Sequence, residues 1–223
     1  MFVSESMAKK VITIDQESNI LFARELMKQN QIRHLPVVEK NGRLIGIITD
    51  RDLRSALPSL LLYDSREEKE KLSRIKVKDI MTKDPITVLP TYTIQDVLLL
   101  IQKARVGALP VVNENGILKG IIGVRDMLRA FINVLGIGEP GTLLCILVED
   151  RIGTMKRIVD AITEEGISFG SILVARYWDK GKRAVFPYLL TQDVSRVKKK
   201  LQQKGFTLLD PMEWYLDQLP GNE

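Results

Sequence analysis

The stretch Gly46-Ile47-Ile48-Thr49-Asp50-Arg51-Asp52 decides the fold of this chain, because most of it occurs twice. The second occurrence is Gly120-Ile121-Ile122-Gly123-Val124-Arg125-Asp126, which lies 74 positions later. The same shift aligns residues 12–57 with residues 86–131 without a gap. A clustered match of this kind indicates two copies of one structural unit, here called the first repeat (12–57) and the second repeat (86–131).

Outside that stretch, the two repeats share a hairpin pattern. Leu35-Pro36-Val37-Val38 precedes Asn41-Gly42 in the first repeat, and Leu109-Pro110-Val111-Val112 precedes Asn115-Gly116 in the second. Apolar β-rich runs on either side of Asn-Gly predict a tight hairpin, since Gly readily adopts the positive φ that such a turn needs. The sequence therefore predicts strands at 35–38 and 44–49, with a helix restarting at 51–57.

A further strand and helix are predicted ahead of each hairpin. The short apolar runs 11–14 and 86–88 are typical of strands, and in the second repeat Ile94, Val97, Leu98 and Ile101 have helical spacing. Thr93 and Asp96 have the spacing of a capping box. Each repeat is thus β-α-β-β-α, too small to bury both faces of its sheet alone, so we expect the two to pack about a pseudo-twofold axis.

The last third of the chain has a different pattern. Apolar runs predict strands at 143–148, 169–177, 184–190 and 207–209, and two amphipathic helices lie between them. The order β-α-β-β-α-β is that of a ferredoxin-like domain, which makes the whole chain an α+β protein. We read residues 58–74 as a linker with a charged helix and the Gly/Pro-rich segment 136–141 as an interdomain linker.

Composition narrows the function classes. The chain has 223 residues, a formal net charge of +5 with both signs interspersed, one cysteine (Cys145) and one histidine (His34). These numbers exclude an internal disulfide and a Cys/His zinc site, and they favour a reducing cytoplasm. Without a long apolar span, an aromatic-basic patch or a hydrolase or kinase motif, we expect no membrane, no nucleic acid, no metal and no catalysis.

Candidate binding residues follow the buried run of the first repeat. Thr49 is placed to cap the next helix, whose free N–H groups attract phosphate. Asp52 can accept hydrogen bonds from two vicinal hydroxyls, and Arg51 can supply positive charge. These groups suit a ribose followed by a phosphate, although Thr49 and Asp52 could equally serve only as a helix cap.

The equivalent positions in the second repeat differ. Arg125 and Asp126 persist, whereas Gly123 replaces Thr49. Arg33 and His34 correspond to Gly107 and Ala108, so we expect two non-equivalent clefts, one with a basic mouth. The alternative is that Arg33 and His34 are an ordinary solvated pair.

The two repeats resemble a tandem pair of CBS domains, a Bateman module. The resemblance rests on Leu35-Pro36-Val37-Val38, the Asn-Gly hairpins, Gly46 to Asp52 and the segment Ile80-Met81-Thr82. It implies binding of AMP, ADP, ATP or S-adenosylmethionine as a regulatory ligand, in clefts that mix the two repeats. The resemblance puts Thr49 and Asp52 opposite Ile86, Gly107 and Ala108, and Asp126 opposite Ile12, Arg33 and His34.

Residues 142–210 resemble an ACT domain through Val148-Glu149-Asp150-Arg151-Ile152-Gly153. That resemblance implies amino-acid binding at Asp150, Arg151, Gly153 and Ser168, although Glu149 to Gly153 could also be a plain strand-to-helix turn. The combination resembles acetoin-utilisation AcuB-type proteins of bacteria, which implies a cytoplasmic, homodimeric regulator of some protein partner. A dimerisation scaffold without a ligand is the alternative. The expected boundaries are 1–64, 65–135, 136–141 and 142–215.

Overall fold

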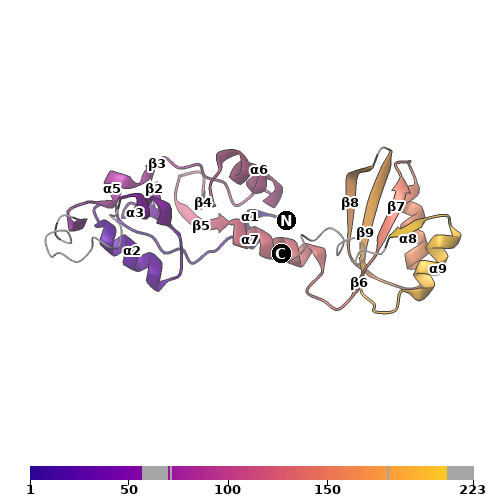
Figure 1. Ribbon diagram of the computed structural model, residues 1–223. Helices are drawn as coiled ribbons and strands as arrows, with labels where there is room; N and C mark the ends of the chain where they lie inside the picture. Colours follow the sequence, from indigo (N-terminus) through magenta and orange to yellow (C-terminus); the bar gives the residue numbers. More distant parts are fainter. Residues whose placement is uncertain (57–69, 71, 180, 210–223) are drawn as a thin grey trace, which may run out of the picture. The chain divides into compact units, whose positions relative to one another are not determined.

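The computed structural model describes residues 1–56, 70, 72–179 and 181–209. The chain forms two compact units, Met1–Arg129 and Ala130–Glu223, and each is considered by itself (Figure 1). In the part of the chain that the structure describes, no helix is long and apolar enough to cross a membrane. Most of the linker expected at 58–74 lies outside the described residues.

The first unit contains the first repeat and the second repeat as far as Arg129, and the two are built from equivalent elements. The first repeat has helix α2 (Ile20–Gln29), strands β1 (His34–Val38) and β2 (Leu44–Thr49) and helix α3 (Asp50–Ala56). The second has α6 (Ile94–Ala104), β4 (Ala108–Val112), β5 (Leu118–Gly123) and α7 (Val124–Leu135). Leu35 pairs with Ile48 in one hairpin, and Leu109 pairs with Ile122 at the same place in the other. The predicted hairpins and helices are confirmed.

The strands predicted ahead of each helix are wrong in extent. Only Ile14 and Val88 make a bridge, each parallel to the first strand of its hairpin, at Val37 and Val111. Ile14 and Val88 each use both backbone groups, for example Ile14 N to Pro36 O at 3.1 Å, and the ladder stops there. In the second repeat Pro85 and Pro90 flank the bridge, and neither can donate to a ladder.

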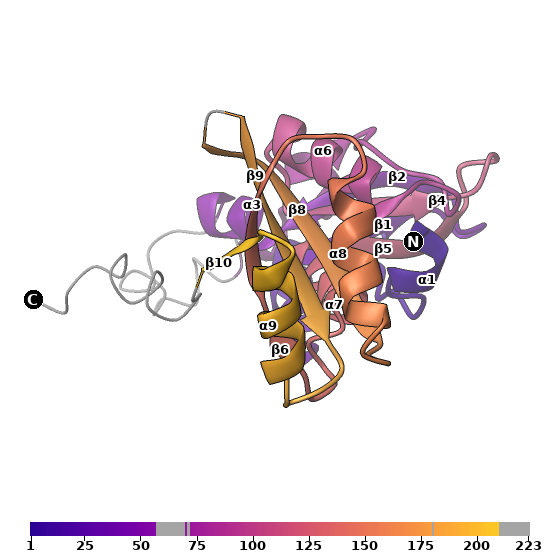
Figure 2. The ribbon, with the colours of Figure 1, turned by 90° about the vertical axis from the view of Figure 1, so that its right-hand side faces the viewer.

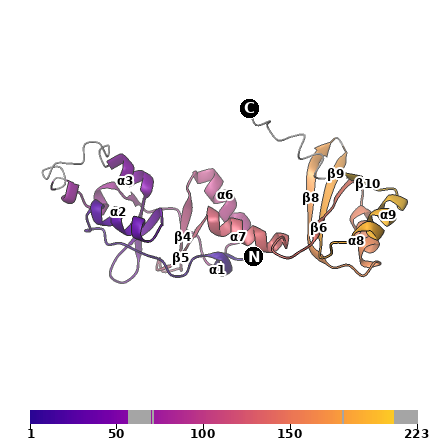
Figure 3. The same ribbon diagram turned by 60° about the horizontal axis from the view of Figure 1, so that its bottom comes forward.

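The two repeats exchange their leading segments. Helix α1 (Val3–Ser6) precedes the first repeat yet lies beside β5 of the second, where Ala8 bridges Ile121. Helix α5 (Val77–Ile80) and strand β3 (Thr82–Lys83) precede the second repeat yet join the first, where β3 pairs with β2. Figures 1 and 3 show α1 next to β5. Neither repeat is complete without a piece of chain from ahead of the other.

The exchanged segments are held by close packing against glycine. A β-carbon added to Gly46 would lie 2.6 Å from Met81 Sδ, and one added to Gly120 would lie 2.5 Å from Met7 Sδ. Gly46 and Gly120 are equivalent positions, as are Met7 and Met81. The close approach of each segment to a strand therefore requires glycine at both sites.

The two hairpins meet at their turns. Leu44 N donates to Gly116 O at 3.0 Å, and Leu118 N donates to Gly42 O at 3.0 Å. A shift of 74 positions converts each bond into the other, which is the relation that a pseudo-twofold axis requires. Gly42 and Gly116 have φ values of +82° and +73°, as predicted for Asn-Gly turns.

The second unit has the predicted order of strands and helices. Its strands are β6 (Thr142–Leu143), β7 (Cys145–Glu149), β8 (Phe169–Asp179), β9 (Lys182–Leu189) and β10 (Thr207–Leu209). They form an antiparallel sheet with β10, β7, β9 and β8 side by side, and β6 pairs with the far end of β9. Helices α8 (Thr154–Thr163) and α9 (Ser195–Gln203) cover one face of it (Figure 2). This topology is ferredoxin-like.

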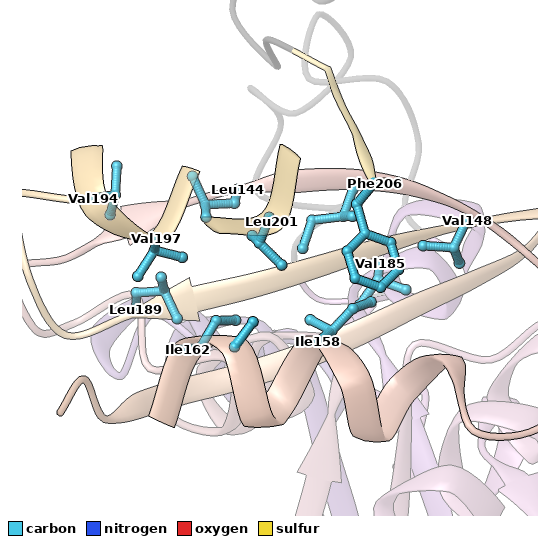
Figure 4. Close-up of a cluster of buried hydrophobic side chains, with 12 residues drawn as sticks. Leu144, Val148, Ile158, Ile162, Val185, Leu189, Val194, Val197, Leu201 and Phe206 are labelled. Atoms are coloured by element: carbon cyan, nitrogen blue, oxygen red, sulfur yellow. The ribbon is translucent and has the colours of Figure 1, made fainter. Parts of the chain in front are cut away.

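The core of this unit lies between the sheet and its two helices. Ile158 and Ile162 of α8 and Val197 and Leu201 of α9 are fully buried against β7 and β9 (Figure 4). These residues carry the helical periodicity that predicted both helices. Cys145 at the start of β7 is 3% exposed, so the thiol is buried as expected.

Candidate functional site

The first repeat and the second repeat together line a cleft of about 510 Å³, here called the first cleft. Thr49, Arg51 and Asp52 reach it from the end of β2 and the start of α3, where the chain turns from a strand into a helix. Ile86, Gly107 and Ala108 of the second repeat line the opposite side. The volume lies within the range of about 300–1,000 Å³ that is usual for small-molecule sites.

Thr49 and Asp52 form a reciprocal cap on α3. Asp52 Oδ2 accepts hydrogen bonds from Thr49 N at 2.8 Å and Thr49 Oγ1 at 2.7 Å, and Asp52 N donates to Thr49 Oγ1 at 3.3 Å. The capping role foreseen as the alternative for these residues is therefore present. This cap uses Oδ2 of Asp52. No hydrogen bond of the cap involves Oδ1, so Oδ1 can accept a hydrogen bond from a ligand.

A second cleft of about 500 Å³ lies at the equivalent place on the other repeat. Arg125 and Asp126 line it, together with Arg33 and His34 of the first repeat. Asp126 Oδ2 accepts from Gly123 N at 2.9 Å, and Asp126 Oδ1 lies 3.7 Å from a nitrogen of Arg129. The carboxylate of this cleft is thus held by one backbone bond and one arginine rather than by a hydroxyl.

Ile12 does not line the second cleft. It is half-buried and packs against the core of the first repeat, a cluster that includes Ile14 and Leu35. The expectation came from the resemblance to a CBS pair, and Ile86, the equivalent residue, does line the first cleft. The two leading runs differ here because Pro85 and Asp84 precede Ile86, whereas Val11 and Lys10 precede Ile12.

Four residues line both clefts: Arg33 and His34 from the first repeat, and Gly107 and Ala108 from the second. His34 packs so closely on Gly107 that a β-carbon at Gly107 would lie 2.9 Å from His34 Nε2. Burial lowers the pKa of His34 below its ordinary value of 6.5, and the neighbouring Arg33 lowers it further. The imidazole is therefore mainly neutral at pH 7.

Gly123 explains the loss of the hydroxyl from the second cleft. A β-carbon there would lie 3.2 Å from Gly107 O and 3.3 Å from the β-carbon of Ala108. Contacts that short are tighter than side chains normally make, so a threonine here would require its neighbours to shift by a few tenths of an ångström. The departure from the first repeat therefore falls at a crowded position.

The second unit has a cavity of about 360 Å³ lined by parts of β7, α8, β9 and β10. Of the residues predicted for amino-acid binding, only Arg151 lines it. Asp150 is ion-paired with Arg183, Gly153 caps α8 with φ of +89°, and Ser168 accepts a backbone bond from Leu190 N. The predicted set is not gathered into one site.

Several cleft residues were missed by the sequence analysis, among them Arg54, Asp84, Arg105 and Arg129. Asp84 and Arg105 have positive φ values of 46° and 55°, which bend the chain into the first cleft. The Asp-Pro pair at 84 and 85 was an available signal for such a turn. Among the described residues, no group of three His, Cys, Asp or Glu side chains could hold a metal ion.

Comparison with protein families places a CBS domain on residues 3–59 and again on residues 77–133. A CBS domain-containing protein of Dictyostelium discoideum is 37% identical over 136 residues, which are 60% of this chain and 94% of that protein. Inosine-5'-monophosphate dehydrogenase of Korarchaeum cryptofilum is 38% identical over 119 residues, 53% of this chain but only 22% of the enzyme. The likeness to that enzyme covers about a fifth of its length.

Solved structures also match the repeats. CBSX2 in complex with AMP has a TM-score of 0.51 at 25% identity, covering 59% of this chain and 96% of that chain. A CBS domain pair in complex with 5-methylthioadenosine and S-adenosyl-L-methionine has a TM-score of 0.50 at 26% identity, covering 59% and 95%. A structure described as a putative acetoin utilization protein (AcuB) from Vibrio cholerae has a TM-score of 0.52 at 29% identity, covering 63% and 98%.

Proposed function

The chain belongs to the CBS-domain family, and from that premise we propose that it is a non-catalytic regulatory protein whose paired repeats bind an adenosine nucleotide. The observation that carries the proposal is the first cleft, where the carboxylate of Asp52, a helix N-terminus and several arginines face one space. The AMP and S-adenosyl-L-methionine complexes of similar CBS pairs support an adenosine ligand.

In the proposed complex, each group of the first cleft has a distinct role. Asp52 Oδ1 accepts hydrogen bonds from the ribose hydroxyls, while Oδ2 stays bonded to Thr49. Arg33 and Arg51 hold the phosphate, assisted by the N-terminus of α3. Ile86 and the flanking backbone supply the apolar wall against which the adenine ring packs.

Isothermal titration of AMP, ADP, ATP and S-adenosylmethionine tests the proposal. Asp52→Ala removes charge-assisted hydrogen bonds worth about 1.5–3 kcal/mol, so affinity should fall by roughly 10- to 150-fold. Silence for all four ligands with the unchanged protein would refute nucleotide sensing and support the scaffold alternative.

Asp96→Ala is a matched control for that experiment. Asp96 makes the same cap on α6, with Thr93 N at 2.9 Å and Thr93 Oγ1 at 2.6 Å, and it lies outside both clefts. Both variants lose one helix cap, which costs about 1 kcal/mol of stability. A loss of binding in Asp52→Ala that Asp96→Ala does not show therefore reports on the ligand and not on the helix.

We also propose that the protein is a homodimer that joins through the second repeat. Leu98 and Leu99 of α6 and Val124 and Leu128 of α7 are exposed, from 42% to 63%. The equivalent positions in the first repeat are Arg24, Glu25, Asp50 and Arg54, and the last two form an ion pair at 2.9 Å. The shared fold does not require apolar residues there, and a buried interface explains them.

Leu128→Arg, which installs the residue of the first repeat, should turn the dimer into a monomer in light scattering. Lys103→Arg on α6 is a control that should leave the mass unchanged. A wild-type monomer at all concentrations would refute the dimer.

For the C-terminal unit we propose an ACT-type role, with an amino acid bound in the cavity next to Arg151 and the signal passed to a protein partner. Its ferredoxin-like topology supports that assignment. The likeness to the AcuB structure makes acetoin utilisation the first pathway in which to seek the partner, in the cytoplasm. Thermal shift with the twenty amino acids tests it, and Arg151→Ala should abolish any stabilisation.

A further inference from the structure

The shared wall of the two clefts is chemically asymmetric. Arg33 and His34 line both clefts, and so do their equivalents Gly107 and Ala108. A symmetric pair of repeats would supply one Arg-His pair to each cleft. This chain supplies one pair for both, because the second repeat has no side chain at position 107 and only a methyl group at 108.

Charge in the first cleft depends on Arg33. Its lining includes four arginines (Arg33, Arg51, Arg54 and Arg105) and three aspartates (Asp50, Asp52 and Asp84). Without Arg33, the three remaining arginines and the three aspartates would give the lining no net charge. Arg54 is already paired with Asp50 at 2.9 Å. An anionic ligand in the first cleft is therefore attracted less strongly when Arg33 is lost.

The second cleft has the same residue in its lining. Its arginines are Arg33, Arg125 and Arg129, and Arg129 lies 3.7 Å from the carboxylate of Asp126. No carboxylate lies within ion-pair distance of Arg33 in the described part of the chain, so its guanidinium is available to either side. Replacing Gly107 with a second arginine is prevented by the contact with His34.

We propose that Arg33 is a single phosphate ligand shared by the two clefts, so that a phosphate-bearing nucleotide in one cleft weakens binding of such a nucleotide in the other. This inference rests on the proposed function. A guanidinium binds phosphate through a planar fork of donors, and that fork faces one anion at a time. The coupling is reciprocal, because each bound nucleotide changes the affinity for the other by the same factor.

The order of filling follows from the remaining groups. The first cleft has Thr49 and Asp52 with a free carboxylate oxygen, whereas the second has Gly123 and a carboxylate already near Arg129. The first nucleotide therefore occupies the first cleft and takes Arg33. The second nucleotide binds without it.

Calorimetry with AMP and adenosine tests the sharing of Arg33. The unchanged protein should bind two AMP per chain, the second about tenfold or more weaker, which is the usual effect of losing one charge-assisted contact. Asp52→Ala weakens AMP binding in the first cleft and leaves Arg33 available to the second. The second cleft should then bind AMP several-fold more tightly than the wild type binds its second AMP. Adding Arg33→Gln to Asp52→Ala should cancel that gain. Adenosine, which has no phosphate, should show no gain.

Arg33→Gln alone provides an independent measurement that keeps Asp52 intact. The affinity for the first AMP should fall by about tenfold or more. The affinity for the second AMP should change by less than about threefold, so that the two affinities converge. Arg129→Gln, which touches only the second cleft, is the matched control and should weaken the second step alone.

The outcomes separate the two proposals. If the wild type binds no nucleotide, the proposed function fails and the sharing fails with it. If two AMP bind with equal affinity, or if the second cleft is no tighter in Asp52→Ala than in the wild type, the sharing is refuted while nucleotide sensing stands. Equal losses in both steps for Arg33→Gln would also refute it, because they would mean that Arg33 serves both ligands at once.

Discussion

Replacement of Gly46 by alanine tests the packing that holds the exchanged segment in the first repeat. Gly46 lies in β2 opposite Lys83 of β3, and Met81 covers it. The new β-carbon would lie 2.6 Å from Met81 Sδ, 3.2 Å from Met81 Cγ and 3.0 Å from the backbone oxygen of Thr82. The thioether can rotate away, but the carbonyl belongs to the paired strand and cannot move alone.

The magnitude follows from two opposing effects. Overpacking of a well-packed site typically costs about 1–3 kcal/mol, and most of that range applies because backbone is involved. Alanine also restricts the unfolded chain more than glycine does, which returns about 0.4–1 kcal/mol. The expected net loss is about 1–2 kcal/mol in the free energy of unfolding.

Urea unfolding followed by circular dichroism measures this loss. With a denaturant slope of about 2 kcal/mol/M, the midpoint of the first unit should fall by about 0.5–1 M. Met81→Ala creates room for the methyl group, so Gly46→Ala should cost at least about 1 kcal/mol less in that background. Gly120→Ala should behave in the same way, with Met7 as its partner. A neutral or stabilising Gly46→Ala, or an equal cost in both backgrounds, would refute the reasoning.

Three further predictions concern single residues. The pKa of His34 is lowered in the folded protein, mainly by burial, so the stability that comes from its neutral form is present above pH 6.5 and is lost as the pH falls through that value. The melting temperature of the wild type should therefore drop more between pH 7.5 and 5.5 than that of His34→Gln. Parallel curves of melting temperature against pH for the two proteins would contradict this. Burial raises the pKa of the Cys145 thiol, so a thiol reagent should label the native protein on the order of 100-fold more slowly than the unfolded one, and equal rates would show that the strand opens readily. Gly123→Thr should lower the free energy of unfolding by about 1 kcal/mol or more, because the new side chain meets Gly107 O. It should not strengthen AMP binding. Urea unfolding and calorimetry measure the two effects, and improved binding would mean that the loop adjusts freely.

The sequence predicted what depends on periodicity and turn chemistry. The two Asn-Gly hairpins, the capping box of Thr93 and Asp96 and the helices of the second unit all come from local patterns, and the structure confirms them. The resemblance to a CBS pair put Thr49 and Asp52 opposite Gly107 and Ala108, and these four residues line one cleft.

What the sequence did not predict depends on contacts between distant segments. Helices α1 and α5 have four residues each, too few for a helical period to appear, and their exchange between repeats leaves no local trace. Ile12 lies outside the second cleft whereas Ile86 lines the first, because the chain ahead of each has a different course. The cavity near Arg151 joins β7, α8, β9 and β10, and no single segment carries its pattern.

The exchange of leading segments gives the two repeats different histories during synthesis. The first repeat receives α5 and β3 shortly after its own helices have been made, so it can close early. Residues 1–8 join the second repeat, where Phe2 bridges Thr93 and Ala8 bridges Ile121 of β5, and that repeat is translated long afterwards. At ~5–20 residues per second the buried positions of this segment, such as Val3, stay uncovered for on the order of 10 s. The second repeat is therefore completed last, by a segment made before the first repeat, and chaperone contacts on the nascent protein should concentrate on residues 1–8.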